Sequence, residues 1–262
     1  MKKFLPLVLF IFACETYDVL QDNPIDPSNP DYELPTVKIL DLIEGQIVTT
    51  DKVDIYLQGN ASVSEYAFRI NSNDPFIDMN DLWSVWSASE IISLEFLNEY
   101  SYELEVKSRY PTDRESNVER VSFTVDAVQP GSLLLYPKQV TIINFENAKI
   151  QLFAHQLSNV SVLDFVIQFD GNSLSFAANE GSKEYGDVNV VTRPYADQIQ
   201  YTIGKYGDNG FNENELIAEI VFKAMNVSGS FSAISILSAT AKSLDAQKVS
   251  IVGTNQVRVD VK

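Results

Sequence analysis

One stretch of the chain, from Tyr100 to Tyr110, alternates strictly between two kinds of side chain. Successive residues of a β-strand point to opposite faces, so the alternation predicts a strand with one buried face and one solvated face. The side chains predicted to face the core are Tyr100, Tyr102, Leu104, Val106 and Ser108, and those predicted to face solvent are Glu103, Glu105, Lys107 and Arg109. A half-buried strand needs paired neighbours and a second layer over its apolar face.

Short runs rich in Val, Ile, Phe, Tyr and Thr recur across residues 36–127, separated by turn residues. These residue types favour strands, and no run shows the 3.6-residue period of a helix. The clearest runs cover residues 36–42, 53–57, 66–70 and 121–125. About seven short strands in a unit of this size predict an N-terminal immunoglobulin-like β-sandwich.

This first unit resembles the immunoglobulin- and fibronectin type III-like modules of bacterial surface proteins. The resemblance rests on Tyr66-x-Phe68-Arg69-Ile70, then Trp83-Ser84-x-Trp86-Ser87, then the alternating strand from Tyr100. It departs from those modules in a long, irregular connection from Asn71 to Leu82 and in having no disulfide. The resemblance implies an architecture, with tryptophan packed over the core, and no activity.

Residues 128–262 form a second β-rich unit, introduced by a short linker at Val128-Gln129-Pro130-Gly131. The length of the unit and its number of apolar runs exceed those of an ordinary immunoglobulin domain. They predict a nine-to-ten-stranded jelly-roll sandwich, so the whole chain is expected to be all-β. The predicted strands are 132–136, 140–145, 149–154, 160–169, 187–192, 198–203, 215–224, 231–238, 248–252 and 256–261.

The order of motifs in the second unit resembles a cohesin, a jelly-roll module related to some carbohydrate-binding modules. The matching segments are Lys149–Ala154, Val162–Asp170, Leu174–Phe176, a Gly-rich turn at 207–210 with the strand Leu216–Ala224, and Gly253–Val261. The resemblance implies a non-catalytic module that recognises a dockerin-like extracellular protein or a polysaccharide. It also implies that one face of the sandwich makes the contact, without naming the contact residues.

The start of the chain has the pattern of a bacterial lipoprotein signal peptide over residues 1–13. Lys2 and Lys3 form a positive region, and a short apolar run follows. The run is too short to cross a bilayer as a helix. Ile11-Phe12-Ala13-Cys14 then looks like a lipobox, which predicts lipidation of Cys14 and anchoring in the bacterial cell envelope, at the outer membrane or cell surface.

Residues 14–35 are rich in Pro, Asp and Asn, and we expect them to form a flexible, extended, acidic tether. Cys14 is the only cysteine, so disulfides and thiolate metal sites are excluded. The net charge of −17 would become −19 on removal of Lys2 and Lys3. Such an acidic protein repels phosphate backbones and anionic lipids, so we expect no nucleic acid partner and membrane contact through the lipid only.

No pattern in the chain predicts an enzyme, a metal site or a cofactor. His155 is the only histidine, and neither a nucleophile-elbow motif nor a phosphate-binding Gly-rich loop is present. Among the many carboxylates, those nearest to strand ends and loops are Asp164, Asp170, Glu213 and Glu215, and their spacing selects no pair for acid–base chemistry. We therefore expect no catalytic residue.

Exposed aromatic side chains are the candidate ligand-binding residues, because they stack on sugars and anchor protein interfaces. The candidates are Trp83, Trp86, Tyr185, Tyr195 and Tyr206. Trp83 and Trp86 are three residues apart, so on a regular strand their rings would point to opposite faces. Three functions follow as hypotheses: binding of an extracellular protein for adhesion or scaffolding, binding of a polysaccharide, and assembly through edge strands.

Overall fold

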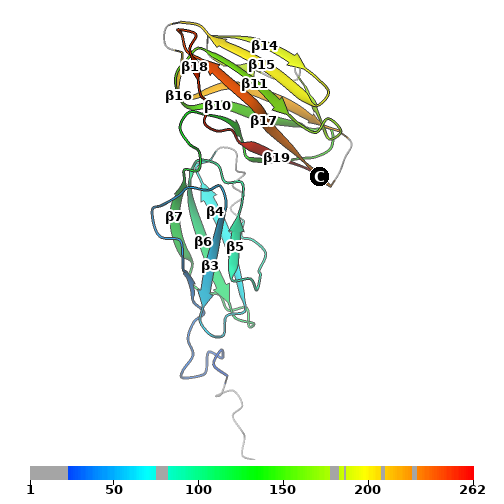
Figure 1. Cartoon of the computed structure of the whole chain (residues 1–262). Helices are drawn as coiled ribbons and strands as arrows, with labels where there is room; N and C mark the ends of the chain where they lie inside the picture. Colours follow the sequence, from blue (N-terminus) through cyan, green and yellow to red (C-terminus); the bar gives the residue numbers. More distant parts are fainter. Residues whose placement is uncertain (1–22, 75–81, 178–182, 186, 208–209, 226–228) are drawn as a thin grey trace, which may run out of the picture.

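A computed structural model describes residues 23–74, 82–177, 183–185, 187–207, 210–225 and 229–262. The secondary structure of these residues is entirely β, without helices, as predicted. Two β-sandwiches follow one another along the molecule (Figure 1). Each has its own apolar core, built from residues between Val37 and Val125 in the first and between Leu133 and Val261 in the second.

The first sandwich has a three-stranded and a four-stranded sheet. The three-stranded sheet has the order β1(Val37–Ile39), β3(Val53–Gly59), β5(Ile91–Leu94), and the four-stranded sheet has the order β2(Gln46–Val48), β7(Glu119–Val125), β6(Ser101–Arg109), β4(Glu65–Ser72). β2 pairs in parallel with β7, whereas the other pairs are antiparallel. The chain thus passes from one sheet to the other between β1 and β2, as in an immunoglobulin-like sandwich.

The second sandwich has a five-stranded and a seven-stranded sheet. In the first, the order is β12(Leu174–Phe176), β16(Phe211–Ala224), β10(Asn147–Val160), β8(Ser132–Tyr136), and β13(Lys183–Glu184) pairs with β16. In the second, the order is β14(Val188–Pro194), β15(Gln198–Lys205), β11(Val162–Gln168), β17(Ser230–Lys242), β19(Gln256–Val261), β9(Gln139–Ile142), and β18(Lys248–Val249) pairs with β17. Aromatic side chains help to fill the space between the sheets, including Phe165 stacked on Tyr201 at 5.2 Å and Phe169 edge-on to Phe222 at 5.2 Å.

Strand β6 confirms the predicted core face and adds a buried charge. Tyr102, Leu104, Val106 and Ser108 are all buried. Glu105 was expected to face solvent, yet it is only 2% exposed. Its carboxylate is clamped between the guanidinium groups of Arg69 and Arg120, and the hydrogen bond from Arg69 is the main reason that its pKa lies below the usual range.

The described part of the predicted tether is not extended, because residues 23–32 fold into three consecutive turns. Asn23, Asp26 and Asn29 each precede a proline, and the carbonyl of each accepts the N–H three residues later at 2.9–3.1 Å. Their side-chain oxygens also accept the N–H two residues later. Proline fixes the second position of such a turn and an Asx side chain caps it, so the repeated Asx-Pro pairs replace extension with coiling.

Candidate binding surfaces

The seven-stranded sheet packs one face against the core and exposes the other to solvent. Along β11, Leu163, Phe165 and Ile167 are buried, and the side chains between them point outward. The strand register aligns Val191, Thr202, Asp164 and Thr240 in one outward row across β14, β15, β11 and β17. We call the outward side chains of the segments over which these four strands pair with one another the open face; they comprise Val162, Asp164, Val166, Gln168, Asn189, Val191, Arg193, Gln198, Gln200, Thr202, Ser235, Leu237, Ser238, Thr240 and Lys242.

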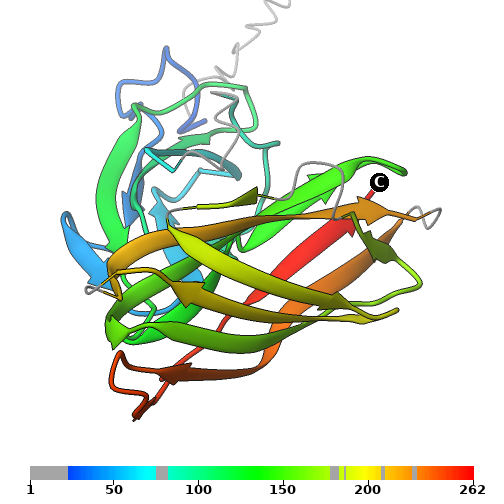
Figure 2. The same ribbon diagram turned by 90° about the horizontal axis from the view of Figure 1, so that it is seen from above.

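The open face has no net negative charge, although the protein as a whole is strongly acidic. Its only charged members are Asp164, Arg193 and Lys242, and Asp164 accepts a hydrogen bond from the Thr202 hydroxyl at 2.7 Å. A bulge in β17 opposite Val166 leaves Leu237 unpaired and 57% exposed. Bulges redirect side chains in this way. β14 and β15 lie at the end of the molecule remote from the first sandwich (Figures 1 and 2), so the first sandwich does not cover them.

Trp83 and Trp86 lie on the same side of the first sandwich, which corrects the expectation that they point to opposite faces. The segment that carries them is not a regular strand. Ser84 and Ser87, three residues apart, bond to Phe68 and Tyr66 of β4, which are two residues apart. One extra residue is therefore accommodated between the two bonds, as in a β-bulge, and it turns both indoles the same way.

The two indoles alternate with three cations from β4 and β6. Lys107 Nζ lies 4.6 Å from the ring centroid of Trp83 and 5.0 Å from that of Trp86. The guanidinium of Arg69 lies 5.0 Å from Trp83, and that of Arg109 lies 4.5 Å from Trp86. These are cation–π distances, so the tryptophan rings are already occupied by side chains of the protein itself. Their main contribution is to cover the outer face of β4 and β6.

The three candidate tyrosines do not form one aromatic surface. Tyr195 and Tyr206 are exposed, and they lie beyond opposite ends of the eight-residue strand β15. At about 3.3 Å per residue they are on the order of 26 Å apart. Tyr185 belongs to the other sheet, where its N–H donates to the carbonyl of Ile217. The structure therefore keeps Trp83 and Trp86 together on the first sandwich and distributes the three tyrosines over separate places on the second.

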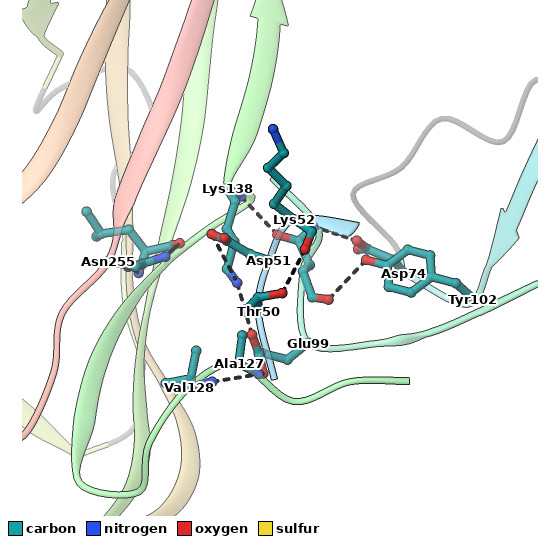
Figure 3. Close-up of polar contacts among 12 residues, drawn as sticks. Thr50, Asp51, Lys52, Asp74, Glu99, Tyr102, Ala127, Val128, Lys138 and Asn255 are labelled. Carbon is teal, nitrogen blue, oxygen red and sulfur yellow. Dashed lines mark hydrogen bonds and ion pairs between the residues drawn. The ribbon is translucent and has the colours of Figure 1, made fainter. Parts of the chain in front are cut away.

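A buried lysine joins the two sandwiches, and sequence patterns did not indicate it. Lys138 follows β8, and its side chain is 3% exposed. Its ammonium donates to Glu99 Oε1 at 3.0 Å and lies 3.8 Å from Asp51 Oδ2 (Figure 3). Its backbone N–H donates to Asn98 Oδ1 at 2.9 Å. Glu99 Oε2 accepts the backbone N–H of Ala127 at 2.8 Å. Glu99 therefore ties the linker and the second sandwich to the first.

A cleft of about 590 Å³ opens beside this junction. Both sandwiches and the linker line it, through Thr49, Thr50, Asp51, Phe96, Ala127, Val128, Gln129, Ser132, Leu134, Lys138, Gly253, Thr254, Asn255, Gln256 and Arg258. Asn255 stabilises one wall, because its side-chain amide accepts the N–H of Leu135 at 2.6 Å and donates to the carbonyl of Leu135 at 2.7 Å. The predicted linker contains the cleft residues Val128 and Gln129, but the sequence has no pattern that predicts a cleft.

Asp170 and Glu215, two of the carboxylates considered for acid–base chemistry, make contacts with other side chains of the protein. The Asp170 carboxylate accepts bonds from Ser173 and Asn172, and the Ser173 bond is the main reason that its pKa is lowered. Glu215 binds the ammonium of Lys205 at 2.6 Å. His155 lies on β10, and its Nε2 is buried with no hydrogen-bond partner among the residues that the structure describes. Among the described residues, no group of three or more His, Cys, Asp or Glu is arranged to hold a metal ion.

The predicted lipidation site lies outside the described residues, as do Cys14 and the signal peptide. In the part of the chain that the structure describes, no helix has both the length and the apolar character needed to span a membrane.

No protein-family model matches the chain, and no curated protein matches it. Solved cohesin structures are similar in fold. The sixth cohesin of scaffoldin B from Acetivibrio cellulolyticus, solved in complex with a dockerin, is 14% identical and has a TM-score of 0.44; the match covers 51% of this chain and 100% of that chain. A non-cellulosomal cohesin from the archaeon Archaeoglobus fulgidus is 10% identical with a TM-score of 0.43, and the match covers 51% of this chain and 92% of that one.

Proposed function

We propose that the chain is a non-catalytic, lipid-anchored protein of the bacterial cell envelope that binds an extracellular protein on the open face. The observation that carries the proposal is the composition of this face. Its three charged side chains, Asp164, Arg193 and Lys242, sum to +1, in a chain with a net charge of −17. The open face therefore lacks the net negative charge of the rest of the surface, and charge complementarity of this kind favours a particular partner and orientation in binding.

The open face also has the geometry of a docking surface. Four hydrogen-bonded strands hold its backbone in place, so little backbone entropy is lost on binding. Val166 lies between Gln200 of β15 and Ser238 of β17, and the exposed Leu237 is beside Ser238. Apolar side chains at the centre, surrounded by amides and hydroxyls, correspond to the core and rim of an interface.

A capture experiment with matched variants tests the proposal. The chain from residue 15 onward is immobilised and exposed to the secreted proteins of the native organism, and each retained protein is then purified and its affinity measured. Val166→Arg places a long charged side chain at the centre of the open face and should abolish binding. Val85→Arg is the control, because Val85 is 87% exposed in the first sandwich. A partner that binds both variants equally would refute this assignment of the face.

The membrane anchor is tested separately. Cys14→Ser should leave the protein unmodified by a labelled fatty acid and release it from the membrane fraction, while the affinity of the soluble protein for its partner is unchanged. Incorporation of the label into the Cys14→Ser variant would contradict lipidation at this residue.

A further inference from the structure

The cleft between the two sandwiches has features that the open face lacks. Its volume of about 590 Å³ lies within the range of small-ligand sites, which occur preferentially where domains meet. Its walls are held in place by the Lys138–Glu99 contact and by the two bonds between Asn255 and Leu135. A preformed cleft loses less entropy on binding than one that must first be ordered.

The cleft contains polar groups that make no hydrogen bond within the described part of the chain. They are the side chains of Thr49, Gln129, Thr254 and Gln256, all of which are exposed. Hydroxyl and amide groups both donate and accept hydrogen bonds, so together they suit a ligand that is rich in hydroxyls. Phe96 adds an apolar ring to the same cleft.

The charges of the cleft are balanced by groups of the protein. Lys138 is paired with Glu99 and lies close to Asp51. Arg258 is paired with Asp260 at 2.8 Å, and its guanidinium also lies 5.6 Å from the Phe96 ring. No cation is left over to attract an anionic ligand into a chain with a net charge of −17. A neutral ligand is not repelled by this net negative charge.

From these observations we infer that the cleft binds a short segment of a neutral oligosaccharide. Gln129 and Gln256 provide the amides that hydrogen-bond its hydroxyls, from the linker side and the β19 side respectively. Phe96 provides the apolar surface that contacts the C–H face of a sugar ring. The cleft shares no residue with the open face but borders it, because Gln256 of β19 pairs with Ser235 of β17.

The test uses the chain from residue 15 onward, labelled with ¹⁵N, and soluble tetra- to hexasaccharides derived from starch, laminarin, xylan and mannan. At least one of them should cause saturable amide shifts confined to residues 49–51, 127–129 and 254–258. The Gln129→Ala, Gln256→Ala double variant should bind about tenfold more weakly, because two hydrogen bonds are lost. Gln200→Ala on the open face should bind like the unaltered protein, and thermal unfolding confirms that each variant is folded.

Three results would overturn the inference. The first is the absence of saturable shifts in the cleft with every member of the panel, and the second is binding that the double variant leaves unchanged. The third is tighter binding of an oligogalacturonate than of any neutral member, which would show that the cleft selects charge.

Discussion

Lys138 of the second sandwich donates a 3.0 Å hydrogen bond from its buried ammonium to Glu99 of the first. An ion pair of this kind is costly to form, because both charges lose water, and it is also costly to break from one side. The residues around it belong to three segments that are far apart in sequence: the β2–β3 loop, the β5–β6 loop and the start of the second sandwich. We therefore expect loss of the pair to change the relative orientation of the two sandwiches as well as their stability.

We expect Lys138→Ala to lower the free energy of unfolding by about 3 kcal/mol, because it leaves the Glu99 carboxylate without its ammonium partner. Denaturant titration checks the stability, and ¹⁵N relaxation checks whether the two sandwiches still tumble as one body. Lys248→Ala is the control, since Lys248 is exposed. Unchanged stability together with unchanged tumbling would show that the junction depends on other contacts.

We call the alternating row of Trp83, Trp86, Arg69, Lys107 and Arg109 the tryptophan–cation ladder. It gives a second prediction, which concerns Lys107. Lys107→Gln should lower the free energy of unfolding by about 2 kcal/mol, because it removes cation–π contacts with both indoles and the 2.8 Å ion pair with Glu115. Since the chain has two tryptophans, near-ultraviolet circular dichroism reports directly on this ladder. Lys52→Gln alters an exposed ion pair in the same sandwich and should leave the spectrum unchanged.

Glu105 should make the stability of the first sandwich fall in acid. Its folded-state pKa is depressed, chiefly by the hydrogen bond from Arg69, whereas in the unfolded chain it stays near 4.5. The stabilisation is therefore complete above pH 4.5 and is lost as the pH falls through the depressed value. Unfolding curves recorded between about pH 7 and about pH 2 should show this loss, and Glu105→Gln should flatten it. An equally steep curve for the variant would assign the acid dependence to other carboxylates.

Features that depend on neighbouring residues in the sequence were predicted, whereas features that depend on contacts between distant segments were not. The alternation in β6 predicted its core face because a strand has a strict period of two, and Leu104 and Val106 are fully buried. Burial of Glu105 could not be predicted in the same way, since its partners Arg69 and Arg120 come from two neighbouring strands. The contact between Lys138 and Asn98 spans 40 residues and follows no period.

The tryptophans show how a correct local rule can give a wrong result. An offset of three residues does place side chains on opposite faces of an ideal strand. The rule fails here because the segment of Trp83 and Trp86 carries one residue more than the stretch of β4 to which it bonds. The expectation of an extended backbone is wrong for residues 23–32 for a related reason: composition indicated solvation, while the three-residue spacing of Asn23, Asp26 and Asn29 determined the turns. The role of residues 14–35 as a tether stays a prediction.

The turns before the first sandwich provide a prediction that one amide can report. The Asp26 carboxylate accepts bonds from the N–H of Ser28 at 2.8 Å and from its hydroxyl at 2.7 Å, and these bonds lower the pKa of Asp26 below 3.8. The Ser28 amide resonance should therefore move on acidification, with a midpoint below pH 3.8. The Ile25 amide is the internal control, since it bonds to the uncharged side chain of Asn23. Asp26→Asn should abolish the titration while keeping the turn, because an amide oxygen still accepts the bond. A Ser28 resonance that titrates equally in the Asn variant would mean that Asp26 does not cap this turn.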